Sequence, residues 1–187
     1  METEMKLGKS ALTVAIVTIL LLMIPFVAMQ ISGEVDWSFM DFAIMGTLIF
    51  ITGMAYVTLT RFASNWLLKL AFIITIGITF FMIWANLAVG LIGSGPHAGN
   101  LMYIVIYLIV AIGTLRYYSN PSKMVYVMLA TIGGLILLTI VAFLAGMQNY
   151  HASSASEILI VNGFFIVPYA IAAILFRDAA RKLKSKN

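Results

Sequence analysis

Six long apolar runs, separated by short polar segments, dominate this sequence of 187 residues. The runs cover residues 10–31, 37–60, 66–92, 100–115, 122–147 and 157–176. A helix needs about 20 predominantly apolar residues to cross the hydrocarbon core of a bilayer, and the runs meet or approach that length. Lipid offers no partner to unpaired backbone groups, and the runs are too long for barrel strands. The sequence therefore predicts an all-α polytopic membrane protein, with six transmembrane helices in a single domain over residues 1–187.

The basic residues are segregated along the chain, and this distribution predicts its orientation. The segments 32–36, 94–99 and 148–156 contain neither Lys nor Arg. All eleven basic residues lie in the N-terminal segment, near the other two connections or in the C-terminal tail. Because cationic side chains resist translocation, we expect both termini to be cytoplasmic. The segments without basic residues then lie on the opposite, outer side of the membrane.

Composition and motif content exclude several classes of protein. With 63% hydrophobic residues, the chain has little room for a soluble domain. Its net charge of +4 does not indicate nucleic acid, because basic residues at helix ends bind anionic lipid headgroups. The absence of cysteine excludes disulfides, thiolate catalysis and Cys-ligated metals. Motifs of hydrolases, metalloproteases and P-loop proteins are also absent. We expect the lipid bilayer as partner, with no nucleic acid, no catalytic residues and no cofactor.

Two local patterns concern the first two apolar runs. The run 10–31 is longer than the apolar core of a signal peptide, and no A-x-A cleavage pattern follows it. We therefore expect a retained helix. Gly46 and Gly53 in the second run recur at helix-contact spacing, which predicts close approach of a neighbouring helix.

The remaining polar side chains gather toward the outer side. They include four acids and several amides, and no basic residue accompanies them. Polar side chains inside the apolar part of a membrane are costly and usually face a cavity or a partner. We therefore predict a ligand-binding set that comprises Glu34, Asp36, Asp41, Asn86, Asn100, Glu157 and Asn162.

Asp41 is the most informative member of this set, and it has two interpretations. It lies about one helical turn beyond Trp37, so it could face inward, near the third and sixth helices, as the main acid of a pocket. Alternatively, the positive N-terminus of the second helix stabilises its carboxylate. We expect Asp36 to cap that helix and Ser156 to cap the last one.

The amides and histidines also have alternative roles. We expect Asn86 in the bundle interior, hydrogen-bonded to a neighbouring helix, because buried amides commonly tie helices together. The same structural role is open to Asn162. We predict no metal site, since His97 and His151 show no H-x-x-x-H or E-x-x-H spacing. A site that combines these histidines with the nearby acids is the weaker alternative.

One segment carries a resemblance to a protein family. The stretch Trp84–Ser94, followed by Asn100–Tyr103, resembles a family of small six-helix bacterial inner-membrane proteins. Further segments that resemble this family are Val35–Ser38, Asp41–Phe42, Asn162–Phe165 and Leu175–Arg181. The chain departs from the family at 95–99, where the pattern has an acid and Asn-Pro-Ala. The resemblance implies a multi-pass protein of the bacterial inner (cytoplasmic) membrane and supplies no substrate.

Together these patterns predict a small transporter, channel or solute-binding protein. An acidic polar pocket, open to the extracytoplasmic side, would attract a small cation or an amine. The alternative is an accessory or sensor protein whose outer loops dock another membrane protein or a second copy of this chain. A third interpretation is an intramembrane enzyme, which would need an acid and a base within reach of a cleft.

Overall fold

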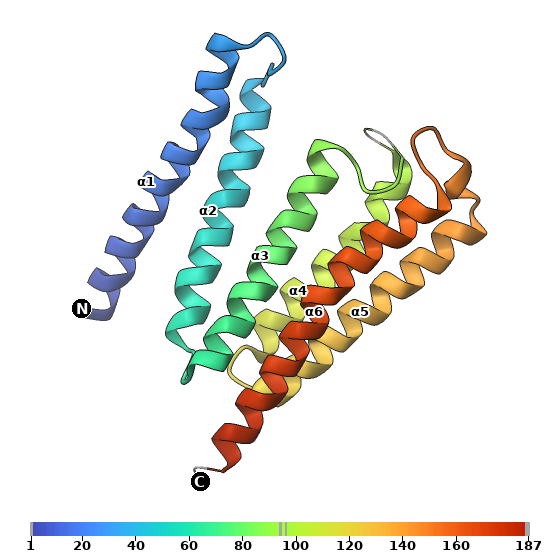
Figure 1. Cartoon of the computed structure of the whole chain (residues 1–187). Helices are drawn as coiled ribbons and strands as arrows, with labels where there is room; N and C mark the ends of the chain where they lie inside the picture. Colours follow the sequence, from blue (N-terminus) through green and yellow to red (C-terminus); the bar gives the residue numbers. More distant parts are fainter. Residues whose placement is uncertain (1, 94, 96, 186–187) are drawn as a thin grey trace. The chain divides into compact units, whose positions relative to one another are not determined.

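The chain is almost entirely helical in a computed structural model that describes residues 2–93, 95 and 97–185, with side chains from residue 8 onward. The elements, shown in Figure 1, are α1 (Glu2–Ile31), α2 (Phe39–Arg61), α3 (Trp66–Ala88), the 3₁₀ helix η1 (Ala98–Met102), α4 (Tyr103–Tyr117), α5 (Pro121–Leu144), the 3₁₀ helix η2 (Met147–Asn149) and α6 (Ala155–Lys184). No strand occurs among these described residues. The all-α fold class is therefore confirmed.

Six helical segments are long and apolar enough to cross a membrane. Their lengths range from 20 to 30 residues, and the mean hydropathy of their most apolar windows ranges from 1.9 to 2.7. These properties are those of a multi-pass membrane protein, so the predicted number of apolar helices is confirmed. The cytoplasmic location of the two termini stays a prediction.

Several helix boundaries differ from those expected. α3 ends at Ala88 rather than near residue 92, because the backbone turns at Gly90, which has a φ of +77°. The fourth span begins with η1, and only from Tyr103 does it become an α-helix. α6 continues to Lys184, beyond the expected end at residue 176. Its basic residues favour the negative C-terminal end of a helix, so the charged tail can stay helical.

The chain divides into two compact units, Met1–Thr58 and Leu59–Asn187. In the first unit, α1 and α2 approach each other closely at two glycines. A Cβ atom built on Gly53 would lie 2.7 Å from Cγ1 of Val14, and one on Gly46 would lie 3.1 Å from Cδ1 of Leu22. The expectation that these glycines permit close helix contact is confirmed.

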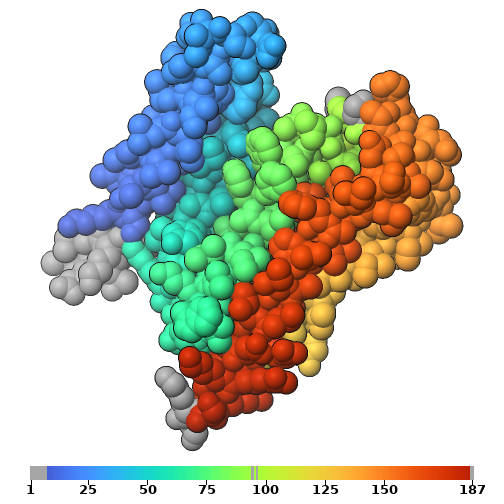
Figure 2. Space-filling view, viewed as in Figure 1, coloured from blue at the N-terminus to red at the C-terminus, as the bar shows by residue number. Residues whose placement is uncertain are grey.

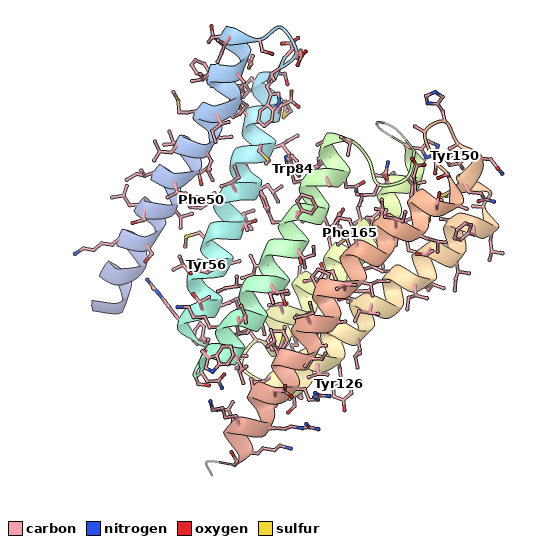
Figure 3. The ribbon with its side chains drawn as sticks, in the orientation of Figure 1. Phe50, Tyr56, Trp84, Tyr126, Tyr150 and Phe165 are labelled. Carbon is pink, nitrogen blue, oxygen red and sulfur yellow. The ribbon has the colours of Figure 1, made fainter. Side chains whose placement is uncertain are left out.

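The second unit packs α3 to α6 around an apolar core. α5 contacts both α4 and α6, and α3 contacts α6, whereas α3 and α4 have few direct contacts. Figure 2 shows α6 lying along α5. Phe165 of α6 (Figure 3) packs against Phe81 of α3, with 6.0 Å between ring centroids. Large side chains that are fully buried in this core are Phe72, Met82, Tyr103, Met128, Phe165, Tyr169 and Phe176.

Candidate functional site: a cavity between α3 and α4

A cavity of about 610 Å³ lies where α3 ends and α4 begins, which we call the η1 end of the second unit. The few contacts between α3 and α4 leave room for it. Its lining residues are Ile83, Asn86, Leu87, Ala88, Gly95, His97, Ala98, Asn100, Leu101, Ile104 and Tyr107. The wall is therefore mainly apolar, with a few amide, imidazole and phenol groups. Two residues of the predicted ligand-binding set, Asn86 and Asn100, line it together.

Asn100 holds the loop that closes this cavity. Its Oδ1 accepts hydrogen bonds from the backbone N–H groups of Leu91 and Ile92, at 2.8 and 2.9 Å. Its Nδ2 donates to the carbonyls of Ile92 and Gly95, at 3.2 and 3.3 Å. Only 7% of the residue is exposed. Both polar atoms of this side chain are thus used within the protein, and Asn100 positions the loop.

The loop can wrap around Asn100 because residue 90 is a glycine. A Cβ atom at Gly90 would lie 2.7 Å from Nδ2 of Asn100 and 2.8 Å from the carbonyl oxygen of Gly95. The positive φ of Gly90 also favours glycine over any other residue. The loop geometry therefore explains why a glycine at position 90 accompanies an asparagine at position 100.

His97 also stabilises the η1 end. Its Nδ1 accepts a hydrogen bond from the N–H of Gly99 at 3.0 Å, which caps η1. Its ring lies 4.2 Å from that of Tyr150, centroid to centroid, in the connection between α5 and α6. His151 is exposed. Within the described part of the chain, no group of three His, Asp or Glu residues could hold a metal ion.

Asn86 carries a buried, unpaired acceptor in the wall of this cavity. Its Nδ2 donates to the carbonyl of Asn100 at 3.1 Å. The Tyr107 hydroxyl lies within hydrogen-bonding reach of the Asn86 side chain, and in the structure it donates to the carbonyl of Met82 at 3.4 Å. The buried Oδ1 of Asn86 therefore lacks a hydrogen-bond donor among the described residues. Asn86 is half-buried, and its partner is the backbone of η1, the 3₁₀ helix with which the fourth membrane span begins.

Of the four predicted acids, only Glu157 belongs to the same unit as the cavity, and it lies outside the lining. Glu34, Asp36 and Glu157 are exposed. Asp41 is exposed as well, and its Oδ2 accepts hydrogen bonds from the N–H and the hydroxyl of Ser38, both at 2.7 Å. The lining that the structure describes is neutral rather than acidic, which differs from the expected pocket. Ligand binding by these acids stays a prediction.

The helix caps also differ from those expected. The N–H of Asp41 donates to Oγ of Ser38 at 3.3 Å, so Ser38 and Asp41 form a reciprocal capping box at the start of α2. Ser38, not Asp36, therefore caps α2. Ser154 rather than Ser156 caps α6, because its extended backbone turns Oγ toward the N–H of Glu157, at 3.2 Å. For Asp41, these contacts favour the alternative role at a helix N-terminus.

Asn162 lies in the core of the second unit and not in the cavity lining. It is 1% exposed, and its Oδ1 accepts a hydrogen bond from the Tyr103 hydroxyl at 2.9 Å. Its Nδ2 donates to the carbonyl of Ile158 at 3.0 Å. Asn162 therefore ties α6 to α4, as the structural alternative expected.

Sequence reasoning did not select Tyr103 or Tyr107. Both lie inside an apolar run, where a tyrosine is easily counted as another apolar residue. A buried tyrosine hydroxyl usually finds a hydrogen-bond partner. The amide at position 162 was the signal that could have identified Tyr103 as its partner.

Comparison of the chain with protein-family models, with curated proteins and with solved structures found no match. The resemblance to small bacterial inner-membrane proteins therefore stays a prediction.

Proposed function

We propose that this chain is a membrane protein that binds a small solute in the cavity between α3 and α4. The observation that carries the proposal is the buried Oδ1 of Asn86, which has no donor among the described residues and belongs to a side chain that lines the cavity. Leaving such an acceptor unpaired costs about 1–3 kcal/mol. Because Oδ1 has almost no accessible surface, the Asn86 side chain would have to rotate toward the cavity for a solute with an N–H or O–H group to recover part of that free energy.

The composition of the wall defines the class of solute. Ile83, Leu87, Leu101 and Ile104 supply an apolar surface, and Tyr107 adds a hydroxyl beside Asn86. Small-molecule sites commonly combine such a surface with a few polar groups that fix orientation, in cavities of about 300–1,000 Å³. We therefore propose a neutral amide or alcohol with an apolar body as the ligand.

The neutral lining supports a neutral ligand over the cation expected from the acidic residues. None of the described lining residues is acidic. An ion that entered the cavity would lose hydration without gaining an opposite charge, which is costly. A neutral amide loses less hydration free energy and gains the hydrogen bond to Asn86.

Packing below the cavity supports binding rather than continuous conduction. Met82, Tyr103 and Ile106 are almost completely buried and belong to α3 and α4, the two helices that form the cavity wall. A channel through the centre of this unit would have to displace such side chains from a close-packed core. Transport by this unit would therefore require movement of α3 against α4, where direct contacts are few.

Three probes that share one ring and differ in charge test the proposal. Benzamide, benzylammonium and benzoate are titrated into the purified protein in neutral detergent, and binding is followed by calorimetry. We expect benzamide to bind more tightly than either ion. If benzylammonium bound most tightly, the result would favour the acidic, cation-binding pocket expected from the sequence. Absence of benzamide binding would contradict the proposal. The Asn149→Ala variant is the control, because it removes an exposed amide outside the cavity.

A further inference from the structure

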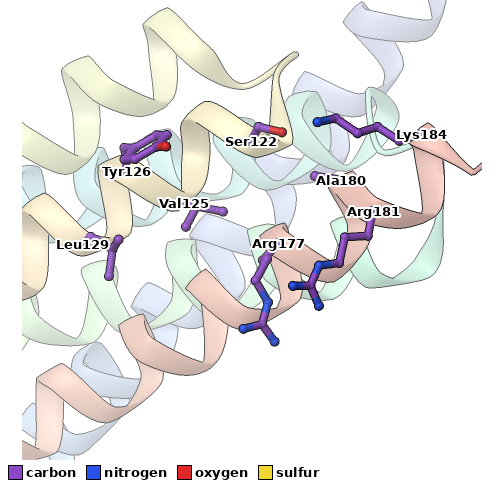
Figure 4. Close-up of a pocket in the computed structure, with 8 residues that line it drawn as sticks. All are labelled: Ser122, Val125, Tyr126, Leu129, Arg177, Ala180, Arg181 and Lys184. Atoms are coloured by element: carbon purple, nitrogen blue, oxygen red, sulfur yellow. The ribbon is translucent and has the colours of Figure 1, made fainter.

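The other end of the second unit carries a basic groove between α5 and α6. Figure 4 shows this groove, which has a volume of about 470 Å³. Three cationic side chains of α6, those of Arg177, Arg181 and Lys184, line it together. Their spacing of four and three residues places them on one face of the helix. They lie where the first turn of α5 meets the last turns of α6, which we call the basic end.

The charge in this groove is largely uncompensated. Arg177 forms an ion pair with Asp178, at 3.2 Å, in which both side chains remain about half exposed. Such exposed pairs contribute little to stability and are easily exchanged for another anion. No acidic residue belongs to the described lining. The groove therefore favours an anionic ligand.

The start of α5 adds two further features that favour an anion. Two hydroxyl-bearing residues of α5, Ser122 and Tyr126, also line the groove. Ser122 also lies in the first turn of α5, where the helix dipole is positive. An anion held by α6 would thus meet hydrogen-bond donors and favourable electrostatics from α5.

The groove also has an apolar part that a free anion would not use. Val125 and Leu129 continue the lining along α5, and Leu129 is 51% exposed. Both belong to a helix that is long and apolar enough to cross a membrane. The cations lie in the last turns of α6, after its apolar stretch. The groove thus has positive charge at its end and an apolar surface beside it. This arrangement matches the anionic headgroup and the acyl chain of a phospholipid.

We propose that the groove between α5 and α6 binds an anionic phospholipid of the adjacent leaflet. Arg177, Arg181 and Lys184 bind its phosphate, and the acyl chain lies along Val125 and Leu129. Guanidinium groups suit this role because they bind phosphate through paired N–H donors. The proposal concerns the basic end alone and does not depend on solute binding at the η1 end.

Native mass spectrometry of protein released from nanodiscs tests this site. The nanodiscs contain phosphatidylglycerol and phosphatidylcholine in equal amounts, and the bound lipid is counted. We expect wild-type protein to retain phosphatidylglycerol preferentially. At about 1 kcal/mol per basic residue, the Arg177→Gln/Arg181→Gln variant should bind it roughly 10- to 30-fold more weakly. Equal retention of both lipids by the wild type would overturn the proposal.

Matched variants separate the groove from general surface charge. The Arg116→Gln/Lys123→Gln variant loses two cations that lie over the Tyr117 ring, outside this groove. It should retain phosphatidylglycerol within about threefold of wild type, whereas an equal loss in both variants would contradict the assignment. The Arg177→Lys/Arg181→Lys variant keeps the charge and should retain most binding. Release of the lipid by millimolar inorganic phosphate would instead indicate a site for free anions.

Discussion

The side-chain amide of Asn86 donates a hydrogen bond to the backbone carbonyl of Asn100, with 3.1 Å between Nδ2 and O. This bond joins α3 to η1 at the wall of the cavity. With Nδ2 occupied, the planar amide fixes Oδ1 as the atom left for another partner. The two asparagines therefore have different roles: Asn100 shapes the loop, and Asn86 holds a buried, unpaired acceptor in the cavity wall.

Asn100→Ala should destabilise the second unit. The substitution leaves the N–H groups of Leu91 and Ile92 without their acceptor. At about 1–3 kcal/mol for each buried group, the free energy of unfolding should fall by about 2–6 kcal/mol. Unfolding in mixed detergent–SDS micelles measures this change. Asn100→Asp keeps the acceptor but turns an oxygen toward the carbonyls of Ile92 and Gly95, so it should also destabilise this unit. Equal stability of wild type and Asn100→Ala would show that the loop does not depend on this side chain.

Gly90→Ala should also destabilise the η1 end, by about 1–2 kcal/mol for the left-handed backbone alone. The added Cβ would further approach Nδ2 of Asn100 to 2.7 Å. Gly77→Ala in α3 is the control, because a Cβ there would meet nothing within 4 Å. In a helix interior it should stabilise by about 0.5–1 kcal/mol. The two substitutions should change the free energy of unfolding in opposite directions in the same assay. A destabilisation of similar size in both variants would disprove this explanation of Gly90.

Gly53→Ala should weaken the packing of α1 on α2. The new methyl group would lie 2.7 Å from Cγ1 of Val14, and such overpacking typically costs about 1–3 kcal/mol. Val14→Ala removes the clashing atoms, so the double variant should be more stable than the sum of the single changes predicts. Strict additivity in the unfolding assay would mean that these two residues are not in contact.

Substitutions in the capping box of α2 distinguish a structural role of Asp41 at the helix N-terminus from a role in ligand binding. Ser38→Ala should destabilise α2 by about 1 kcal/mol, because the N–H of Asp41 loses its acceptor. Asp41→Asn should have a smaller effect, since an amide oxygen can still accept from Ser38. Hydrogen exchange of the first turn of α2 reports both changes. If Asp41→Asn instead left this turn unchanged and altered solute binding, Asp41 would belong to a ligand site after all.

The number and class of the helices could be predicted from sequence, because hydropathy over about 20 residues is a strong signal. Helix ends were less predictable. Hydropathy counts Val89, Leu91 and Ile92 as helical, whereas the backbone at Gly90 turns away from the helix. Hydropathy also failed to predict that the helix continues after Phe176, because charged residues end a membrane span without ending the helix.

The candidate site could be predicted only in part. Asn86 and Asn100 were recognisable as amides near apolar runs, but their pairing depends on the loop between them, which no periodicity describes. The acids were grouped because they share one side of the predicted membrane. Charge pattern alone does not distinguish a pocket from a helix cap, although the spacing from Ser38 to Asp41 is that of a capping box.

The most direct test compares benzamide with N,N-dimethylbenzamide, which has no N–H to donate, in wild type and in Asn86→Ala. One hydrogen bond of about 0.5–1.5 kcal/mol should give the wild type a preference of about 2- to 12-fold for benzamide. In Asn86→Ala the ratio of the two dissociation constants should fall toward one, while Asn149→Ala keeps the wild-type ratio. An unchanged preference in Asn86→Ala, or no preference in the wild type, would contradict solute binding through the Asn86 carbonyl.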